Sequence, residues 1–340
     1  MITVHPFGDY SHRQPLAYPA IRSHVGDVIA VSRDMAAADL VIVAHSKDLE
    51  RHGLALRQRL RPDQRLVLLS EEPLWDTVWA PTPLRRAQVH MTAAGRLPYV
   101  FLNHHSSTIF DFDRIPYFLL TEHAFFPRYA RWFARNGART PEDWARHFEQ
   151  TEFDIGFIAE YRDGAEFDAT FPAAGIYGLG KRRTEIALAC TQGRVLRTGA
   201  GWNRLPRRQS LPDWHLEKFL DYDHRIRLLS AIENTHQDNY VSEKIFDSFA
   251  MGAVPLYIAG PLHRVSDLAP SGSWLNLVGL SPADAAARIG EFRISDRFLT
   301  RYATAQRALA DLFASPGALV AEHDRLRRAL VRELGACLTG

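Results

Sequence analysis

The chain is poor in cysteine and has no long apolar run. Its two cysteines, Cys190 and Cys337, stand far apart among 340 residues, so neither a disulfide framework nor a zinc site of regular Cys/His spacing is indicated. The first residues, MITVHPFGDYSHRQ, lack the basic and then apolar pattern of a secretion signal. No stretch reaches the roughly 18 apolar residues that a membrane-spanning helix needs. We therefore expect a cytoplasmic protein in a reducing compartment.

Net charge is almost absent as well. The chain has 41 lysines and arginines against 39 acidic residues, for a formal charge of +2, so no strong field favours nucleic acid, although local basic clusters can still meet anionic ligands. No GxGxxG follows the first apolar run, which counts against a sugar-nucleotide dehydrogenase or epimerase. What the chain does have is 46% hydrophobic residues, enough at this length for two domains of ordinary size.

Short apolar runs alternate with longer helical patterns, which is typical of parallel sheets with crossover helices. In the first half, strands are predicted at residues 2–4, 28–31, 40–44, 66–69 and 99–103, and a helical segment at 122–149. In the second half, strands are predicted at 155–159, 194–198, 228–232 and 254–258, and helices at 181–190 and 214–220. The pattern predicts an α/β fold with domains at 1–152 and 153–310.

Residues 311–340 are predicted to form a C-terminal helix. Leu326, Leu330 and Leu334 recur at four-residue spacing on one face, with arginines beside them. This stripe favours packing against the body of the protein, and a surface for peripheral contact with a membrane or a partner is the alternative.

Residues 231–260, AIENTHQDNYVSEKIFDSFAMGAVPLYIAG, read as a strand, a polar loop, a helix and a second strand. In an open α/β sheet, ligands bind beyond the carboxyl ends of the strands, where Glu233 and Asn234 fall. Asn239 is predicted to cap the helix, and Gly252 stands where a left-handed residue ends it.

The start of this helix suits a phosphate. Its first backbone N–H groups lack partners within the helix, and Lys244 adds a positive charge in the same turn. Glu243 has a carboxylate that accepts hydrogen bonds from hydroxyl groups such as those of a ribose. The alternative is an ordinary first-turn glutamate beside a solvated lysine.

The same segment resembles the signature of the α1,3/α1,4-fucosyltransferase family, glycosyltransferase family 10. That signature runs F-E-N-S, a short loop, D-Y-V-T-E-K, a helix, a glycine-containing turn and V-P-[VI]-Y-x-G. The matching residues are Glu233, Asn234, Tyr240, Val241, Glu243, Lys244, Gly252, Val254, Pro255, Tyr257 and Gly260. The departures are Ile232 for Phe, Thr235 for Ser, Asn239 for Asp and Ser242 for Thr.

The resemblance covers the C-terminal half well and the N-terminal half loosely. It implies a GT-B type fold, with two Rossmann-like domains facing each other across a cleft and a helical C-terminal tail. It also implies that the C-terminal domain holds GDP-fucose, without a further cofactor, that the N-terminal domain is on the acceptor side, and that transfer inverts the anomeric carbon. In the family, the residues that correspond to Asn234 and Lys244 contact the pyrophosphate, the Glu243 equivalent holds the ribose, and the Tyr240 equivalent lies beside the nucleotide.

An upstream arginine also contacts the pyrophosphate in this family, on the helix that follows the first strand of the C-terminal domain. The run KRRTEIALA resembles that helix and points to Arg183, with Arg182 as the alternative. Arginine suits the role because its planar group binds two phosphate oxygens at once and stays charged. An exposed basic helix start is the other interpretation. The run LPRR at 205–208 is expected to be a solvated loop or an acceptor-side patch.

Inverting transfer also needs a base that takes the proton of the acceptor hydroxyl. The run RLVLLSEEPLW ends a predicted strand at Glu71 and Glu72, and the family has a glutamate in an E-x-P setting here, which favours Glu71 over Glu72. Adjacent like charges and partial burial would raise the pKa of one carboxyl. A pair of solvated turn glutamates is the alternative. His104 and His105 are weaker candidates, for acceptor contact or for capping a turn.

Two D-x-D patterns, Asp111 with Asp113 and Asp221 with Asp223, are weak signals for a metal. Basic side chains and a helix start are able to neutralise a diphosphate, so we expect no required metal. Together these features predict an inverting fucosyltransferase that acts on a sugar of a bacterial-type surface glycan, such as a lipopolysaccharide or capsule. A related enzyme with another nucleotide sugar and a non-catalytic nucleotide-sugar or glycan-binding protein are the alternatives.

Overall fold

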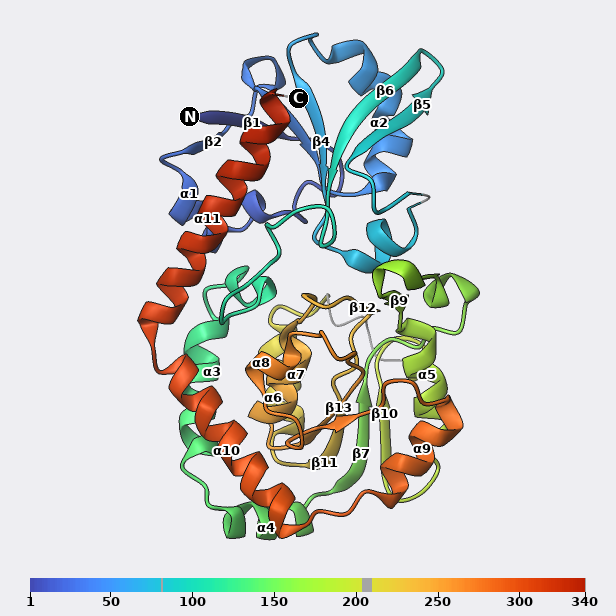
Figure 1. Cartoon of the computed structure of the whole chain (residues 1–340), viewed down its shortest axis with the longest axis vertical. Helices are drawn as coiled ribbons and strands as arrows, with labels where there is room; N and C mark the ends of the chain where they lie inside the picture. The colour runs from blue at the N-terminus through green and yellow to red at the C-terminus, as the bar shows by residue number, and fades with distance from the viewer. Residues whose placement is uncertain (81, 204–209, 340) are drawn as a thin grey trace. The chain divides into compact units, whose positions relative to one another are not determined.

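The computed structural model describes residues 1–80, 82–203 and 210–339. The chain forms two compact units: unit 1 comprises Met1–His123 and Gly317–Gly340, and unit 2 comprises Ala124–Pro316 (Figure 1). Each unit has its own parallel sheet covered by helices.

Unit 1 contains a six-stranded sheet in the order β2-β1-β3-β4-β6-β5, in which only the β5–β6 pair is antiparallel. Its central strand β3 has the sequence LVIV and is buried along its whole length, as expected for a parallel strand covered on both faces. The strands are β1 (Ile2–Pro6), β2 (Ile29–Val31), β3 (Leu40–Val43), β4 (Arg65–Leu69), β5 (Ala87–Thr92) and β6 (Gly95–Leu102). The helices are η1 (Pro15–Ala17), α1 (Pro19–Val25), η2 (Met35–Ala37), α2 (Ser46–Arg59), the π-helical turn η3 (Pro73–Val78) and η4 (Tyr117–Leu120).

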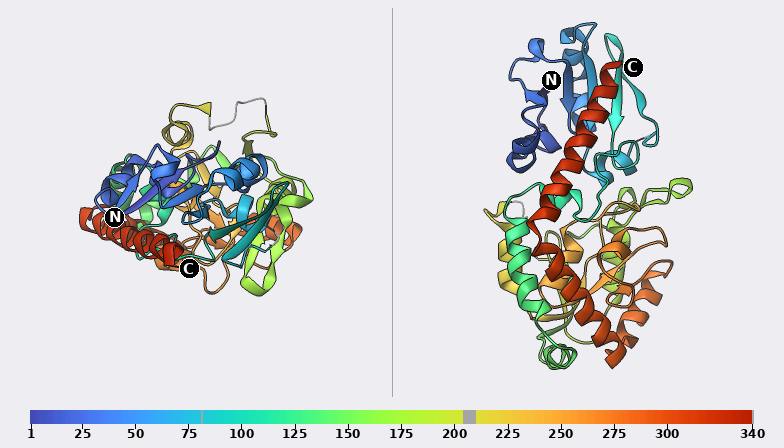
Figure 2. Two further views of the ribbon diagram at one scale, coloured as in Figure 1. Left: turned by 90° about the horizontal axis from the view of Figure 1, so that it is seen from above. Right: turned by 60° about the vertical axis from the view of Figure 1, so that its left-hand side comes forward.

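The C-terminal helix α11 (Pro316–Thr339) belongs to unit 1, where both chain termini lie (Figure 2). Its stripe of Leu326, Leu330 and Leu334 is fully buried. The packing interpretation of this stripe is therefore the one that the structure shows. Among the described residues, no helix combines the length and the apolar character that a bilayer crossing demands.

The carboxylate of Glu322 on α11 fastens the loop before η4. Glu322 is buried and accepts hydrogen bonds from the backbone N–H groups of Asp113 at 3.0 Å, Arg114 at 2.9 Å and Ile115 at 3.3 Å. One buried side chain thereby satisfies three backbone donors that no strand or helix pairs.

Unit 2 contains a five-stranded parallel sheet in the order β10-β7-β11-β13-β14 and a small antiparallel sheet in the order β12-β9-β8. The strands are β7 (Phe153–Ile158), β8 (Thr170–Phe171), β9 (Ile176–Gly178), β10 (Val195–Thr198), β11 (Ile226–Ser230), β12 (Thr235–His236), β13 (Val254–Tyr257) and β14 (Leu275–Asn276). The helices are α3 (Phe125–Gly137), α4 (Pro141–Glu149), η5 (Ala165–Asp168), η6 (Pro172–Ala174), α5 (Gly180–Ala189), α6 (Trp214–Tyr222), α7 (Glu243–Ala250), α8 (Val265–Leu268), α9 (Pro282–Glu291) and α10 (Asp296–Phe313).

The two large sheets share a doubly wound order. When the strands of each large sheet are numbered among themselves in chain order, both sheets begin 2-1-3-4, so the direction of winding reverses beside the first strand. The expectation of an α/β fold with two Rossmann-like domains is confirmed by this topology.

The predicted domain boundary after residue 152 differs from the division at His123. The helices α3 and α4 belong to unit 2, because Asn136 on α3 donates to the backbone oxygens of Phe249 and Ala250, at 3.0 and 2.8 Å, and Trp144 on α4 packs against Tyr302. The predicted helix at 122–149 is also divided, since Thr140 caps a new helix at α4.

The helix α7 begins later than predicted. Its cap is Ser242, whose side chain accepts the backbone N–H of Lys244, so the expectation that Asn239 caps this helix is wrong. The helix ends as expected at Gly252, which has φ +72°. Because the cap lies at Ser242, Glu243 and Lys244 form the first two helical positions.

We predict that Glu322→Ala lowers the free energy of unfolding by about 3 kcal/mol, because it removes the acceptor of three backbone N–H groups and the ion-pair partner of Arg325. Urea unfolding measures this loss, and hydrogen exchange at residues 113–115 should accelerate. Asp324→Ala is the control, since Asp324 is exposed on the same helix. Equal stabilities of the two variants would contradict this role of Glu322.

Candidate functional site

The candidate site of unit 2 lies where its sheet reverses winding, between β7 and β11. The loop after β7 carries Arg162, and the segment after β11 carries Glu233 and Asn234. The helix α5 adds Arg183 and the helix α7 adds Lys244. Ligands of doubly wound sheets bind at this position because both loops leave the same edge of the sheet.

Arg183 is the most unusual residue of this group. It is only 4% exposed, and its Nη1 donates to the backbone oxygen of Ile232 at 3.0 Å and to Oδ1 of Asn234 at 3.3 Å. Within the part of the chain that the structure describes, its Nε has no hydrogen-bond partner. Burial, followed by the charge of nearby Arg162, lowers the pKa of Arg183 to about 10. A buried cation of this kind is costly unless an anion compensates it.

Arg162 stands beside Arg183 and was not predicted. It is 9% exposed, its Nη2 pairs with Glu160 at 3.0 Å, and its Nη1 lies 3.5 Å from Oδ1 of Asn234. Two guanidinium groups thus share one amide oxygen. The signal for Arg162 in the sequence is a basic residue shortly after the strand predicted at 155–159.

Lys244 is held in place by acidic neighbours. Its Nζ lies 3.1 Å from Glu233, 3.4 Å from Glu243 and 2.8 Å from Oγ of Ser242. Although burial opposes the charge, Glu233 and Glu243 raise the pKa of Lys244 above its ordinary value. The side chain stays a partly exposed cation at the start of α7.

Glu233 organises this helix start. It is 2% exposed, and its carboxylate accepts the backbone N–H of Ser242 at 2.8 Å and the Ser242 hydroxyl at 2.7 Å. The hydroxyl of Tyr257 lies 3.5 Å from the same carboxylate. This geometry explains Glu233 as the group that fixes the cap and Lys244.

The remaining predicted donor residues take different places. Glu243 is partly exposed at the helix start, whereas Tyr240 is buried. Arg182 has a different partner from Arg183: its guanidinium donates to the backbone oxygen of Leu280. The basic run at 205–208 lies outside the described residues.

A buried polar network lies behind Lys244. Asp247 on α7 is paired with Lys218 and accepts hydrogen bonds from His215 at 2.7 Å and Tyr129 at 2.6 Å. Burial opposes its charge, but Lys218 and then His215 hold the pKa of Asp247 well below its usual range. Sequence reasoning missed this network because its members come from α3, α6 and α7, up to 118 positions apart.

In unit 1, Glu71 follows β4 and is 4% exposed. Its carboxylate oxygens accept hydrogen bonds from the hydroxyls of Tyr18 and of Tyr117, the latter at 2.6 Å. Burial raises the pKa of Glu71 to about 7, although both tyrosine hydrogen bonds lower it, and the charge of Glu72 adds a smaller increase. A carboxyl group with such a pKa is able to exchange protons near neutral pH.

The histidines after β6 differ from each other. His104 is buried, and its Nε2 donates to the backbone oxygen of Glu71 at 2.9 Å, so it supports the loop that carries Glu71. Burial lowers the pKa of His104 to about 3, which keeps it neutral. His105 is exposed, and its backbone N–H donates to the Asn103 side chain at 2.9 Å, as in a capped turn.

The two D-x-D patterns lie in different units. Asp111 and Asp113 belong to the loop that Glu322 fastens, and Asp113 is exposed. Asp223 is paired with Arg135 at 2.6 Å, while Asp221 is exposed on α6. The structure thus gives Asp223 an ion-pair role.

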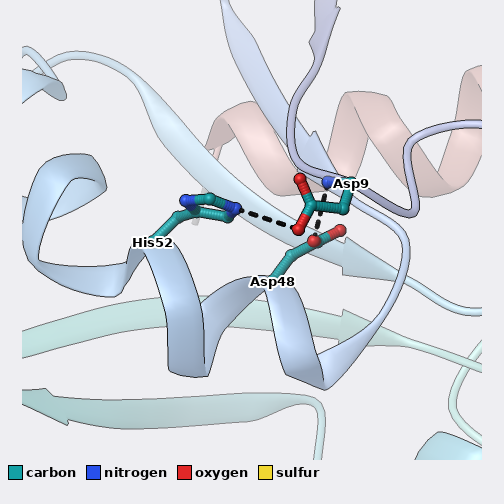
Figure 3. A group of neighbouring side chains, drawn as sticks. All are labelled: Asp9, Asp48 and His52. Atoms are coloured by element: carbon teal, nitrogen blue, oxygen red, sulfur yellow. Dashed lines mark hydrogen bonds and ion pairs between the residues drawn. The ribbon is translucent and has the colours of Figure 1, made fainter.

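One further cluster in unit 1 has metal-ligand residue types: Asp9, Asp48 and His52 (Figure 3). Asp48 accepts the backbone N–H groups of Asp9 at 2.8 Å and Tyr10 at 3.2 Å, and Asp9 is paired with Arg51 at 2.8 Å. These bonds explain the cluster as the fastening of the loop after β1.

No family model and no curated protein sequence match the chain. Among solved structures it is similar to an α1,3-fucosyltransferase with GDP-fucose, with a TM-score of 0.44 and 13% identity over 96% of this chain and 89% of that one. For an α1,3-fucosyltransferase with GDP, the values are 0.44 and 12%, over 100% and 90%. For another structure of an α1,3-fucosyltransferase, they are 0.41 and 14%, over 92% and 80%. Because this likeness is distant, the assignment of the candidate site depends on the geometry of its own residues.

We predict that Glu71→Gln stabilises the protein at alkaline pH. The pKa of Glu71 is raised from its ordinary value of 4.5 to about 7 in the folded state, so the stability that the protonated group contributes at low pH is lost as the pH rises between these values and stays lost above them. The neutral variant should gain about 2–3 kcal/mol at pH 8 relative to its effect at pH 4.

Urea unfolding of the wild type and the variant at both pH values checks this difference. Glu72→Gln is the control, since Glu72 is less buried. A Glu71→Gln effect that is the same at pH 4 and pH 8 would disprove the raised pKa.

Proposed function

We propose that the chain is a glycosyltransferase whose unit 2 binds a nucleoside diphosphate sugar. The observation that carries the proposal is Arg183, a buried cation without a carboxylate partner among the described residues, next to Arg162 and Lys244. A diphosphate would supply the missing negative charge. The position of these cations at the carboxyl edge of the sheet, beside the start of α7, supports the same assignment.

The donor that we propose is GDP-fucose. The order of Asn234, Tyr240, Glu243 and Lys244 along the chain resembles the donor signature of the α1,3/α1,4-fucosyltransferases. In this assignment Arg183, Lys244 and Asn234 face the diphosphate, while Glu243 accepts hydrogen bonds from the ribose hydroxyls. The cations offset the charge of the leaving diphosphate, which is why we expect no metal requirement.

The proposed reaction is an inverting transfer. The acceptor hydroxyl oxygen attacks the anomeric carbon, the bond from this carbon to the β-phosphate oxygen breaks, and GDP leaves. Glu71 takes the proton of the attacking hydroxyl. Its pKa of about 7 suits this role, because a useful fraction is ionised at neutral pH. The acceptor that we propose is a sugar hydroxyl of a surface glycan.

A second function is a nucleotide-sugar-binding protein without transfer. The enclosure of Glu71 favours it, since both carboxylate oxygens already accept tyrosine hydroxyls and little of the side chain is exposed. In that case the carboxyl group would only hold Tyr18 and Tyr117. Both functions predict that the donor binds, but only the transferase predicts turnover.

The donor assignment predicts selective binding of GDP over UDP and CMP in calorimetry. Lys244→Ala should weaken GDP binding by about 1–3 kcal/mol, because a charge-assisted contact is lost. Lys181→Ala is the matched control, since Lys181 lies on α5 beside the arginines and pairs with Glu185 at 3.9 Å. Equal GDP affinity of Lys244→Ala and wild type would refute the site.

The base assignment predicts that Glu71→Gln lowers turnover at least about 100-fold while GDP affinity stays unchanged. In the wild type, kcat/KM should rise with pH and level off above about pH 7, since only the ionised carboxylate accepts the proton. Release of GDP from GDP-fucose, with and without added glycan, measures both.

Glu72→Gln separates the two adjacent glutamates. A loss of turnover in Glu72→Gln but not in Glu71→Gln would move the base to Glu72. Donor binding with no turnover on any glycan would favour the binding protein instead.

A further inference from the structure

We propose that a hollow in unit 2, next to the cations, binds the sugar rings of an oligosaccharide acceptor. The hollow has a volume of about 710 Å³, within the range of about 300–1,000 Å³ that is usual for ligand pockets. It is bounded by the end of η5, the β8–β9 turn, the start of α5 and the loops after β12, β13 and β14. The inference rests on the proposed transferase function and assigns it a second subsite.

The rim of the hollow exposes apolar side chains that normally are covered. Tyr177, Leu262 and Val278 line it and are 38%, 77% and 44% exposed. An exposed apolar group at a concave site is typical of a surface that a ligand covers. The ring of Tyr177 offers a flat face for the C–H groups of a sugar.

The polar lining suits hydroxyl groups better than phosphates. The lining contains two exposed acidic residues, Asp168 and Asp238, against one arginine, Arg182, whose Nη2 donates to the Leu280 carbonyl. Carboxylates accept hydrogen bonds from several hydroxyls but repel an anion. The occupant is therefore a neutral polyhydroxyl compound with apolar faces, which describes a glycan.

The floor of the hollow is fixed before any ligand arrives. Nε2 of His236 accepts the backbone N–H of Gly260 at 2.9 Å, so its Nδ1 is the donor to the Gly175 oxygen at 2.8 Å. His236 ties the β12–β9 pair to the loop after β13. A fixed floor lowers the entropic cost of binding.

The hollow adjoins the cation group through shared backbone. Arg182 lines the hollow and the next residue, Arg183, belongs to the cation group, while the backbone N–H of Leu179 donates to the Asn234 oxygen at 2.8 Å. A sugar in the hollow would thus lie near the diphosphate of the donor.

The hollow also continues along unit 2. A second hollow of about 330 Å³ shares Gly260, Pro261 and Val278 with the first and extends to Trp274 and Asn276. A continuous wall of this kind suits a chain of sugars better than a single ring.

The test is titration of the full-length protein with lactose, maltose and N,N′-diacetylchitobiose, followed by saturation-transfer NMR. Tyr177→Ala should weaken the best-bound sugar about tenfold, and Tyr177→Phe should restore binding because the ring face returns. Leu262→Ala should also weaken it, whereas Leu220→Ala, a matched change of a leucine that is 68% exposed on α6, should not. GDP affinity should stay unchanged in all four variants.

Failure of all three sugars to bind, or equal losses in Leu262→Ala and Leu220→Ala, overturns the glycan subsite. Octyl glucoside provides a further arm: Tyr177-dependent binding that requires its alkyl chain would identify an apolar-tail site and overturn the inference as well. If GDP binds and the sugars do not, this inference fails alone. If the sugars bind through Tyr177 and GDP does not, the proposed donor site fails and the glycan site stands.

Discussion

The burial of positive charge at the edge of the unit 2 sheet is the constraint on which the rest of the site depends. Among the described residues, the buried Arg183 donates to a carbonyl and an amide oxygen, and Arg162 adds a like charge beside it that Glu233 and Glu160 offset in part. Such an arrangement persists only if the surrounding structure holds it, because the local electrostatic energy is unfavourable. Glu233 supplies part of that support by fixing Lys244 and the start of α7.

The same constraint explains why α3 belongs to unit 2. Asp247 on α7 faces Lys218 from α6 and the Tyr129 hydroxyl from α3, so one buried carboxylate ties three helices together. Removal of any partner would leave a charge or a donor unpaired in the interior. The helix that carries the candidate donor residues is thereby held from behind as well as at its cap.

The sequence predicted what local patterns determine. Apolar runs located the parallel strands except β14, and the order of Asn234, Glu243 and Lys244 pointed to one edge of the candidate site. It did not predict the β5–β6 hairpin, because β5 alternates exposed and half-buried residues. It also did not predict the sheet of β8, β9 and β12, because these strands are short. Ser242 replaced Asn239 as the cap because Glu233, nine positions earlier, holds the Ser242 N–H and hydroxyl. Arg162 lies near the other cations because β11 pairs in parallel with β7, so the segments after the two strands leave the same edge of the sheet.

Two buried carboxylates, Asp247 and Glu71, have opposite pKa shifts because their surroundings differ. Asp247 is enclosed like Glu71, but Lys218 and His215 hold its pKa low, so it stays ionised and inert. The carboxylate oxygens of Glu71 accept hydrogen bonds from two tyrosine hydroxyls, and burial raises its pKa to about 7. A group with a purely structural role gains stability from a paired charge, whereas Glu71 costs stability at neutral pH. That cost fits the proposed role of Glu71 as the proton acceptor, because a carboxyl group with a raised pKa is suited to proton transfer.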